Sequence, residues 1–182
     1  MKLKKLEDSL EIPEKTEVKY EEGVFIVKGP EGEASKKLIN PKVKIEIKDK
    51  MIIFSAKNAT KMEKKTIATF KAHTKNLLRG VNEKYVYKLK VCSGHFPMTV
   101  ELKGSELIVK NLFGESVPRV LKIKKGAEVK VEGAIISVQS TEKEVAGQVA
   151  AEIENLTKRT EFDRRVFQDG IYITQKGKKE IK

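Results

Sequence analysis

An internal repeat constrains the fold of this chain more than any other feature. Residues 18–38 read VKYEEGVFIVKGPEGEASKKL, and residues 100–120 read VELKGSELIVKNLFGESVPRV. At an offset of 82 positions and without a gap, six of the 21 pairs are identical. A repeat of this length indicates two copies of one module. A feature that is present in only one copy is therefore a candidate for function.

Strand-like patterns recur in the same order in both copies. Short apolar runs bounded by turn residues, such as Val24–Val27 and Ala134–Val138, predict strands. A further strand is expected at Tyr85–Val91, where it would link the two modules. These patterns predict an α+β fold of two tandem similar domains, 1–81 and 82–182, each with a small antiparallel β-sheet packed on one main α-helix.

A helix pattern closes each copy. In the first copy, apolar positions from Ile67 to Val81 are spaced three and four residues apart. The second copy repeats this spacing from Val145 to Leu156. A Thr followed three residues later by Glu precedes each run and predicts a capping box; the pairs are Thr60/Glu63 and Thr141/Glu144.

Composition favours a polyanionic partner. The 182 residues include 38 Lys plus Arg against 26 Asp plus Glu, a net charge of +12 with a pI of about 9.6. Such an excess favours nucleic acid first and an anionic membrane second. Neither helix pattern is the basic amphipathic kind that lies on membranes. Cys92 is the only cysteine, so an internal disulfide is impossible and a reducing, cytoplasmic location is expected.

The second copy ends in a segment that the first copy lacks. Residues 157–182 hold 8 basic and 4 acidic side chains, including three of the five arginines. Phe162, Phe167 and Tyr172 lie among these cations. Aromatic rings stack on unpaired bases and arginines bridge phosphates, so the mixture is typical of RNA binding. A solvated basic loop that leads into a strand, with its rings in the core, is the alternative.

Signs of catalysis or metal binding are weak. His73, His95 and Cys92 are too dispersed for a metal site, which needs three or four ligands at short spacings. Ser93 and His95 lie beside Cys92, but neighbours on a strand point to opposite faces and no acid is placed to complete a triad. We expect no enzymatic activity, no cofactor, no metal and no small-molecule substrate.

Seven short motifs, in this order and spacing, resemble the family of large-subunit ribosomal protein six in its archaeal and eukaryotic form. They are Ile26–Gly32, Asn76–Val81, Tyr87–Lys90, His95–Pro97, Asn111–Glu115, Pro118–Val120 and Asp163–Tyr172. The resemblance covers nearly the full chain. It implies a duplicated α+β fold and a non-enzymatic role in the large ribosomal subunit. It also implies that the C-terminal domain binds ribosomal RNA near the sarcin–ricin loop, where translational GTPases dock, with ribosomal proteins as neighbours.

The resemblance further implies which residues contact RNA. In the C-terminal segment these are Lys158, Arg159, Arg164, Arg165, Phe167, Gln168, Asp169, Gly170 and Tyr172. Earlier in the second domain they are Lys88, Lys90, His95 and Arg119. Two other functions stay open from the residues alone. A free-standing RNA chaperone would share the charge, and a protein-interaction adaptor would use a sheet edge such as the Tyr85–Val91 strand.

Overall fold

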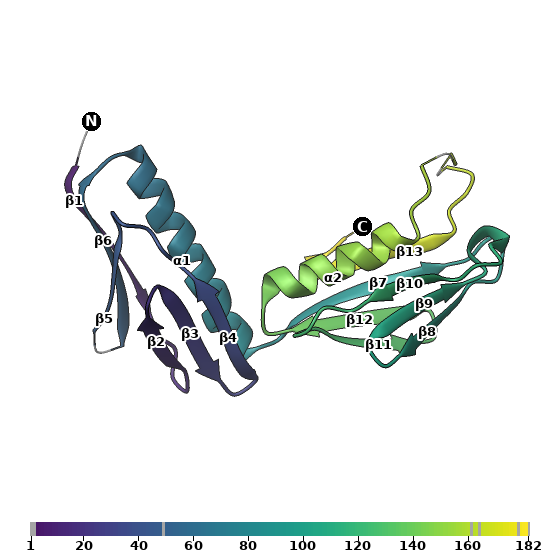
Figure 1. The fold of residues 1–182 in the computed structure, drawn as a ribbon, viewed down its shortest axis with the longest axis horizontal. Coiled ribbons are helices and arrows are strands. Elements are labelled where there is room, and N and C mark those ends of the chain that lie inside the picture. Colours follow the sequence, from purple (N-terminus) through teal and green to yellow (C-terminus); the bar gives the residue numbers. More distant parts are fainter. Residues whose placement is uncertain (1–2, 49, 161, 164, 178, 182) are drawn as a thin grey trace. The chain divides into compact units, whose positions relative to one another are not determined.

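The computed structural model describes residues 3–48, 50–160, 162–163, 165–177 and 179–181. The chain divides into two compact units, Met1–Lys84 (unit 1) and Tyr85–Lys182 (unit 2). Each contains antiparallel strands and one main helix (Figure 1). The predicted α+β class with two similar domains is confirmed.

Unit 1 runs through β1 (Leu3–Glu11), β2 (Glu17–Glu21), β3 (Val24–Gly29), β4 (Gly32–Lys37), β5 (Lys44–Lys48) and β6 (Met51–Ala59) to α1 (Lys61–Asn82). The strands form two sheets, β1-β6-β5 and β2-β3-β4. The core of unit 1 includes Phe25, Phe54 and the inner face of α1. On that face, Ile67, Phe70, Thr74, Leu77 and Val81 are all buried, as their spacing predicts.

Unit 2 begins with β7 (Tyr85–Cys92), β8 (Thr99–Lys103), β9 (Glu106–Lys110), a 3-10 turn (Leu112–Gly114) and β10 (Arg119–Lys122). It continues with β11 (Glu128–Glu132), β12 (Ile135–Ser140), α2 (Lys143–Leu156), β13 (Gly170–Lys176) and β14 (Lys179–Glu180). The sheets are β10-β9-β8 and β11-β12-β7-β13-β14. The strand predicted at Tyr85–Val91 is confirmed as β7; it is not a separate link between the modules but pairs with β12 on one side and β13 on the other, inside the sheet of unit 2.

The repeat extends well beyond the region of identical residues. β1 and β7, β2 and β8, and α1 and α2 each begin 82 positions apart, at residues 3 and 85, 17 and 99, and 61 and 143. β1 pairs with β6 as β7 pairs with β12. Unit 2 then adds β13, which occupies the other edge of β7. In unit 1, only Glu83 and Lys84 follow α1 before β7 begins.

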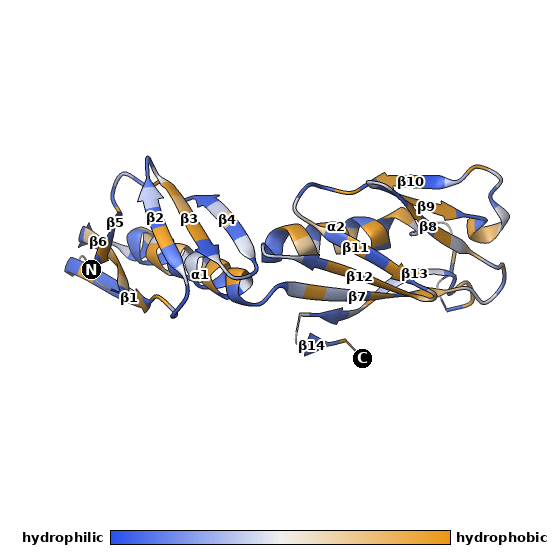
Figure 2. Ribbon diagram, turned by 90° about the horizontal axis from the view of Figure 1, so that it is seen from below, coloured by the Kyte–Doolittle hydropathy of each residue, from blue (hydrophilic) through white to orange (hydrophobic). Residues whose placement is uncertain are grey.

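Alternation along the strands explains why the sheets bury one face. In β7, Tyr85, Tyr87 and Leu89 are buried while Lys88 and Lys90 are exposed. Figure 2 shows this change between hydrophilic and hydrophobic residues along the strands of both units. α2 covers the buried face of this sheet through Val149 and Ile153.

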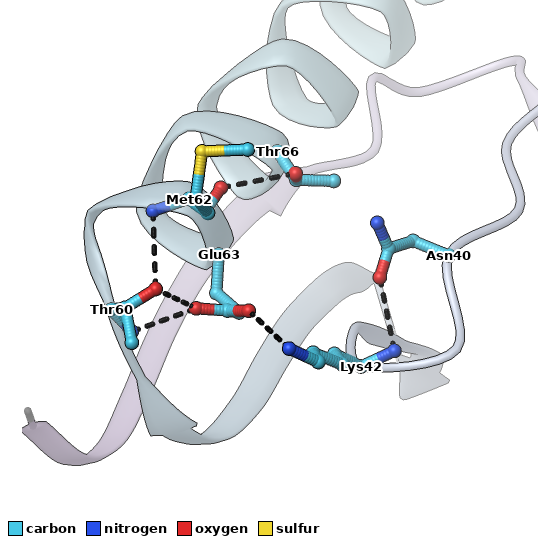
Figure 3. A network of polar contacts seen from close by, with 6 residues as sticks. All are labelled: Asn40, Lys42, Thr60, Met62, Glu63 and Thr66. Carbon is cyan, nitrogen blue, oxygen red and sulfur yellow. Dashed lines mark hydrogen bonds and ion pairs between the residues drawn. The ribbon is translucent and has the colours of Figure 1, made fainter.

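The start of α1 is fixed by a polar network (Figure 3). Thr60 and Glu63 form the predicted capping box: the Thr60 N–H donates to Glu63 Oε2 at 2.8 Å, and Thr60 Oγ1 accepts from Met62 N at 3.3 Å. Lys42 Nζ lies 3.2 Å from Glu63 Oε1. The side-chain and backbone hydrogen bonds from Thr60 lower the pKa of Glu63 to about 2, against an ordinary 4.5.

The second capping box was predicted wrongly. The residue that precedes α2 is Glu142, and its side chain makes no capping hydrogen bond. Ser140 Oγ instead accepts from Glu142 N at 3.1 Å and donates to the carbonyl of Gly126 at 2.7 Å. Ser140 lies at the end of β12, so the entry to α2 is fixed from the preceding strand.

Candidate nucleic-acid interface

The candidate site is built around residues 157–169, which connect α2 to β13 (the connecting segment). In Figure 1 it is the yellow-green loop that leaves the end of α2 and returns to the sheet as β13. A tight turn orders its middle, because the N–H groups of Val166 and Phe167 both donate to the carbonyl of Asp163, at 3.1 and 2.8 Å. The segment leads into a strand, β13, that begins at Gly170.

Aromatic rings of the connecting segment meet rings from two earlier loops. Phe162 stacks on Phe113, with ring centroids 5.3 Å apart and planes at 22°. Phe167 packs edge-on against Phe162 at 4.9 Å and lies 5.3 Å from the His95 ring. The Arg159 guanidinium carbon lies 4.3 Å from the centroid of Phe162, within cation–π range. The three Phe rings are partly buried and the His95 ring is exposed, so the cluster remains accessible to solvent and is not part of the buried core.

The turn that carries Phe113 has an unusual backbone. Asn111 and Phe113 adopt left-handed conformations, with φ of 58° and 51°, which are uncommon outside glycine. The Asn111 side chain donates to the carbonyl of Pro97 at 2.9 Å and so ties the turn to the loop after β7. This local strain places the Phe113 ring beside the connecting segment.

Asp169 joins the connecting segment to the loop after β7. Its carboxylate accepts hydrogen bonds from the backbone N–H groups of Gly94, His95 and Phe96. Burial alone would raise the pKa of Asp169, but these three donors and the nearby His95 ring outweigh it, so the pKa lies below its ordinary value. The structure therefore gives this predicted RNA contact a definite role in positioning the His95 loop.

Arg119 is also engaged within the protein. Its Nε and Nη2 donate to Glu115 at 2.8 and 2.7 Å, and its Nη1 donates to the carbonyl of Leu156 at 2.7 Å, at the end of α2. Arg159 Nη1 lies 3.5 Å from the same Glu115 carboxylate. The hydrogen bonds from Arg119 lower the pKa of Glu115. Glu115 therefore holds one arginine at the helix end and one in the connecting segment.

Other predicted cations are exposed to solvent. Lys158 is exposed, and its side chain has no partner among the residues that the structure describes. The Arg165 side chain is 89% exposed and pairs with Asp163 at 2.8 Å, which raises the pKa of Arg165. Lys88 and Lys90 project from the open face of the β7 sheet.

The remaining predicted residues lie as follows. Gln168 is exposed, and Gly170 is buried at the start of β13. Tyr172 pairs with Lys90 across β13 and β7. The predicted contact Arg164 lies outside the described residues.

A cavity of about 160 Å³ brings many of these side chains together beside the end of α2. Sequence reasoning proposed some of its lining as contacts, namely Lys158, Arg159, Phe167, Asp169 and Tyr172. Phe162 was named among the rings of this segment, although not in the list of contact residues, whereas Phe113, Glu154 and Asn155, which line the same cavity, were not anticipated. Phe113 lies inside the motif Asn111–Glu115, so that motif was the available signal.

Two further findings concern the described residues as a whole. None of their helices is both long enough and apolar enough to cross a bilayer. They also include no cluster of three or more His, Cys, Asp or Glu side chains arranged to hold a metal ion.

Comparison with known proteins identifies the family. A family profile described as "Ribosomal protein L6" matches residues 96–170, a region that includes the connecting segment. The chain is 41% identical to large ribosomal subunit protein uL6 of Methanosarcina mazei, over 96% of this chain and 99% of that protein. It is 40% identical to uL6 of Nanoarchaeum equitans (100% and 98%) and 35% identical to that of Methanococcus vannielii (97% and 97%). The chain therefore belongs to the family of large ribosomal subunit protein uL6.

Proposed function

We propose that this chain is a structural component of the large ribosomal subunit and binds large-subunit ribosomal RNA mainly through unit 2. The uL6 family consists of ribosomal proteins and not of enzymes. Neighbouring ribosomal proteins are its expected protein partners, and the ribosome in the cytoplasm is its expected location. Family resemblance favours a binding region near the sarcin–ricin loop.

One observation carries this proposal: exposed cations and a partly open ring cluster occur together on the connecting segment. Lys158 and Arg165 are exposed; the ring of Phe162 lies between them in sequence, and that of Phe167 follows two residues after Arg165. Cations that replace condensed counterions supply affinity, and rings stack on unpaired bases. The connecting segment has no equivalent after α1, because β7 begins at Tyr85.

The test is the salt dependence of binding to deproteinised large-subunit ribosomal RNA. The wild-type chain is compared with the Lys158→Ala/Arg165→Ala variant and with Lys125→Ala/Lys130→Ala. The control removes two exposed lysines of unit 2 that have no partner among the described residues. Each lost phosphate contact reduces the slope of log K against log[salt] by about 0.7–0.9, so the first variant should lose about 1.4–1.8.

The control variant should keep a slope close to that of the wild type. Equal slopes and affinities for all three proteins would contradict the proposal. Cosedimentation with large subunits in high salt completes the test. A chaperone or an adaptor would not remain bound in stoichiometric amount, whereas a structural component would.

A further inference from the structure

We propose that the cavity beside the end of α2 binds one unpaired nucleobase of the ribosomal RNA. This inference rests on the proposed function, and it assigns a ligand to a specific place within the interface. The cavity measures about 160 Å³ and lies between the last turn of α2, the connecting segment and the start of β13. Its lining has two parts, a set of flat surfaces and a polar edge.

The flat surfaces come from rings and a guanidinium group. Phe113, Phe162 and Phe167 all line the cavity, and Phe162 and Phe167 meet at 89°. Arg159 lies over the Phe162 ring at 4.3 Å and lines the cavity as well. Aromatic rings and arginine planes are the surfaces on which proteins stack unpaired bases.

The polar edge comes from the end of α2. Asn155 and Lys158 line the cavity, both are exposed, and neither side chain has a partner among the described residues. An amide both donates and accepts hydrogen bonds, which matches the mixed edge of a base. The two acidic residues of the lining are already engaged, since Glu154 Oε1 accepts from Ile173 N at 3.0 Å and Asp169 holds the His95 loop.

Other ligands match only part of this lining. A phosphate group would be attracted by Lys158 and Arg159, but it would also face the carboxylates of Glu154 and Asp169 and would gain nothing from the rings. An aliphatic side chain would cover the rings but leave the amide of Asn155 without a partner. A planar ring with a polar edge satisfies both parts, and the partner under the proposed function is RNA. A nucleobase is therefore the ligand that the cavity fits.

The first experiment titrates the ¹⁵N-labelled full chain with small probes and follows its amide signals by NMR. The probes are AMP, GMP, CMP, UMP, ribose 5-phosphate and N-acetyltyrosinamide. We expect at least one nucleotide to shift the Asn155 side-chain amide and the backbone amides near Arg159 and Ile171. Equal shifts with ribose 5-phosphate would make this an anion site and overturn the proposal. Shifts with N-acetyltyrosinamide alone would make it a protein-binding site and overturn it too.

The second experiment compares Asn155→Ala with Gln148→Ala in binding to deproteinised large-subunit ribosomal RNA. Gln148 is a matched control, because it is an exposed amide on α2 that does not line the cavity. Asn155→Ala should weaken binding by about 2- to 10-fold, the worth of one hydrogen bond. The salt slope should stay unchanged, because the lost group is neutral. Gln148→Ala should bind like the wild type.

The outcomes separate this inference from the proposed function. If Asn155→Ala binds like the wild type while Lys158→Ala/Arg165→Ala reduces the salt slope, the base-binding cavity is wrong and the RNA interface stands. If neither variant changes binding, both proposals fail. If Gln148→Ala weakens binding as much as Asn155→Ala, the effect is not specific to the cavity, and the inference fails as well.

Discussion

Asp169 accepts the backbone N–H of His95 at 3.1 Å, and this hydrogen bond joins two loops that lie 74 residues apart in sequence. Gly94 and Phe96 donate to the same carboxylate, whose side chain is only 1% exposed. The His95 ring in turn lies 5.3 Å from the ring of Phe167. The connecting segment and the loop after β7 are therefore held as one surface, and Asp169 is the residue that positions them.

Replacing this carboxylate tests its positioning role. In Asp169→Asn, the amide nitrogen would face backbone donors, so at least one buried hydrogen bond to a charged acceptor is lost. We expect unit 2 to lose about 1–3 kcal/mol of unfolding free energy. Amide hydrogen exchange at Gly94, His95 and Phe96 should become faster. Urea unfolding followed by circular dichroism, together with exchange measured by NMR, checks both effects.

The control for this prediction is Asp163→Asn, at an exposed carboxylate of the connecting segment. Asp163 pairs with Arg165 and accepts no hydrogen bond from the His95 loop. This variant should leave exchange at residues 94–96 unchanged. Slow exchange at those amides in Asp169→Asn would show that the carboxylate does not hold the loop.

A second prediction concerns whether Arg119 contacts RNA or supports the site from within. All of the hydrogen-bonding nitrogens described for Arg119 are directed at Glu115 and Leu156. Lysine keeps the charge but cannot form this bidentate pair. Arg119→Lys should therefore lower the unfolding free energy of unit 2 by about 1 kcal/mol. The salt slope of RNA binding should not change, because the number of cations is the same.

Thermal unfolding and salt titration of the same preparations distinguish the two roles of Arg119. Lys122→Arg, on the same strand and exposed, serves as the control and should change neither quantity. If Arg119→Lys kept full stability but bound RNA more weakly, Arg119 would be a contact and not a support.

The fold could be predicted from the sequence because the internal repeat indicates two similar domains and the spacing of apolar residues indicates their strands and helices. The offset of 82 residues between 18–38 and 100–120 also separates the starts of the two helices. The buried face of α1 follows from the three- and four-residue spacing alone. β1 was not anticipated, because Leu6 and Leu10 share one face of the strand but Asp8 lies between them, so no apolar run marks it. An edge strand can form without strict alternation, since backbone pairing with β6 supplies its hydrogen bonds.

The candidate site was less predictable than the fold. Charge and ring content point to the connecting segment, but they do not show which charged groups are engaged internally. Asp169 accepts a hydrogen bond from His95, 74 residues away, and Arg119 donates one to Leu156, 37 residues away. Nothing in the neighbouring sequence indicates such long-range pairings. The position of Phe113 depends on a left-handed turn that no glycine marks in the sequence at residues 111 and 113. The second capping box failed because the helix begins after Glu142, whose side chain makes no capping hydrogen bond, and Ser140 Oγ, at the end of β12, accepts from the Glu142 N–H.

A third prediction tests the backbone at the start of β13. Gly170 has φ of 151°, a conformation that side chains rarely adopt. A Cβ here would lie 3.3 Å from Thr157 Oγ1, the atom that accepts the N–H of Ile171 at 2.9 Å. Gly170→Ala should therefore destabilise unit 2 by about 1–3 kcal/mol. Urea unfolding measures the loss.

Gly133→Ala is the matched variant for Gly170→Ala. Gly133 also has a positive φ, 60°, but a Cβ there would meet no atom within 4 Å. Its substitution should cost about 1–2 kcal/mol from backbone strain alone. Equal losses for both variants would mean that the contact with Thr157 contributes nothing.

The last prediction concerns pH and the start of α1. Glu63 has a pKa of about 2 in the folded chain, below its ordinary 4.5, because Thr60 donates hydrogen bonds to its carboxylate. A lowered folded pKa means that the ionised carboxylate stabilises the folded state. This contribution is complete above about pH 4.5 and is lost as the pH falls toward 2. Acid should therefore weaken unit 1 over that interval.

Glu63→Gln removes the ionisation and should abolish this part of the pH dependence. We expect the variant to be less stable than the wild type at pH 6, and the difference in unfolding free energy should shrink steadily between pH 4.5 and 2.5. Urea titrations followed by circular dichroism at each pH measure it. Glu33→Gln is the control, because Glu33 is an exposed carboxylate whose ion pair with Lys28 is 3.4 Å long. A difference between wild type and Glu63→Gln that stayed constant from pH 6 to 2.5 would show that the charge of Glu63 does not stabilise the helix start.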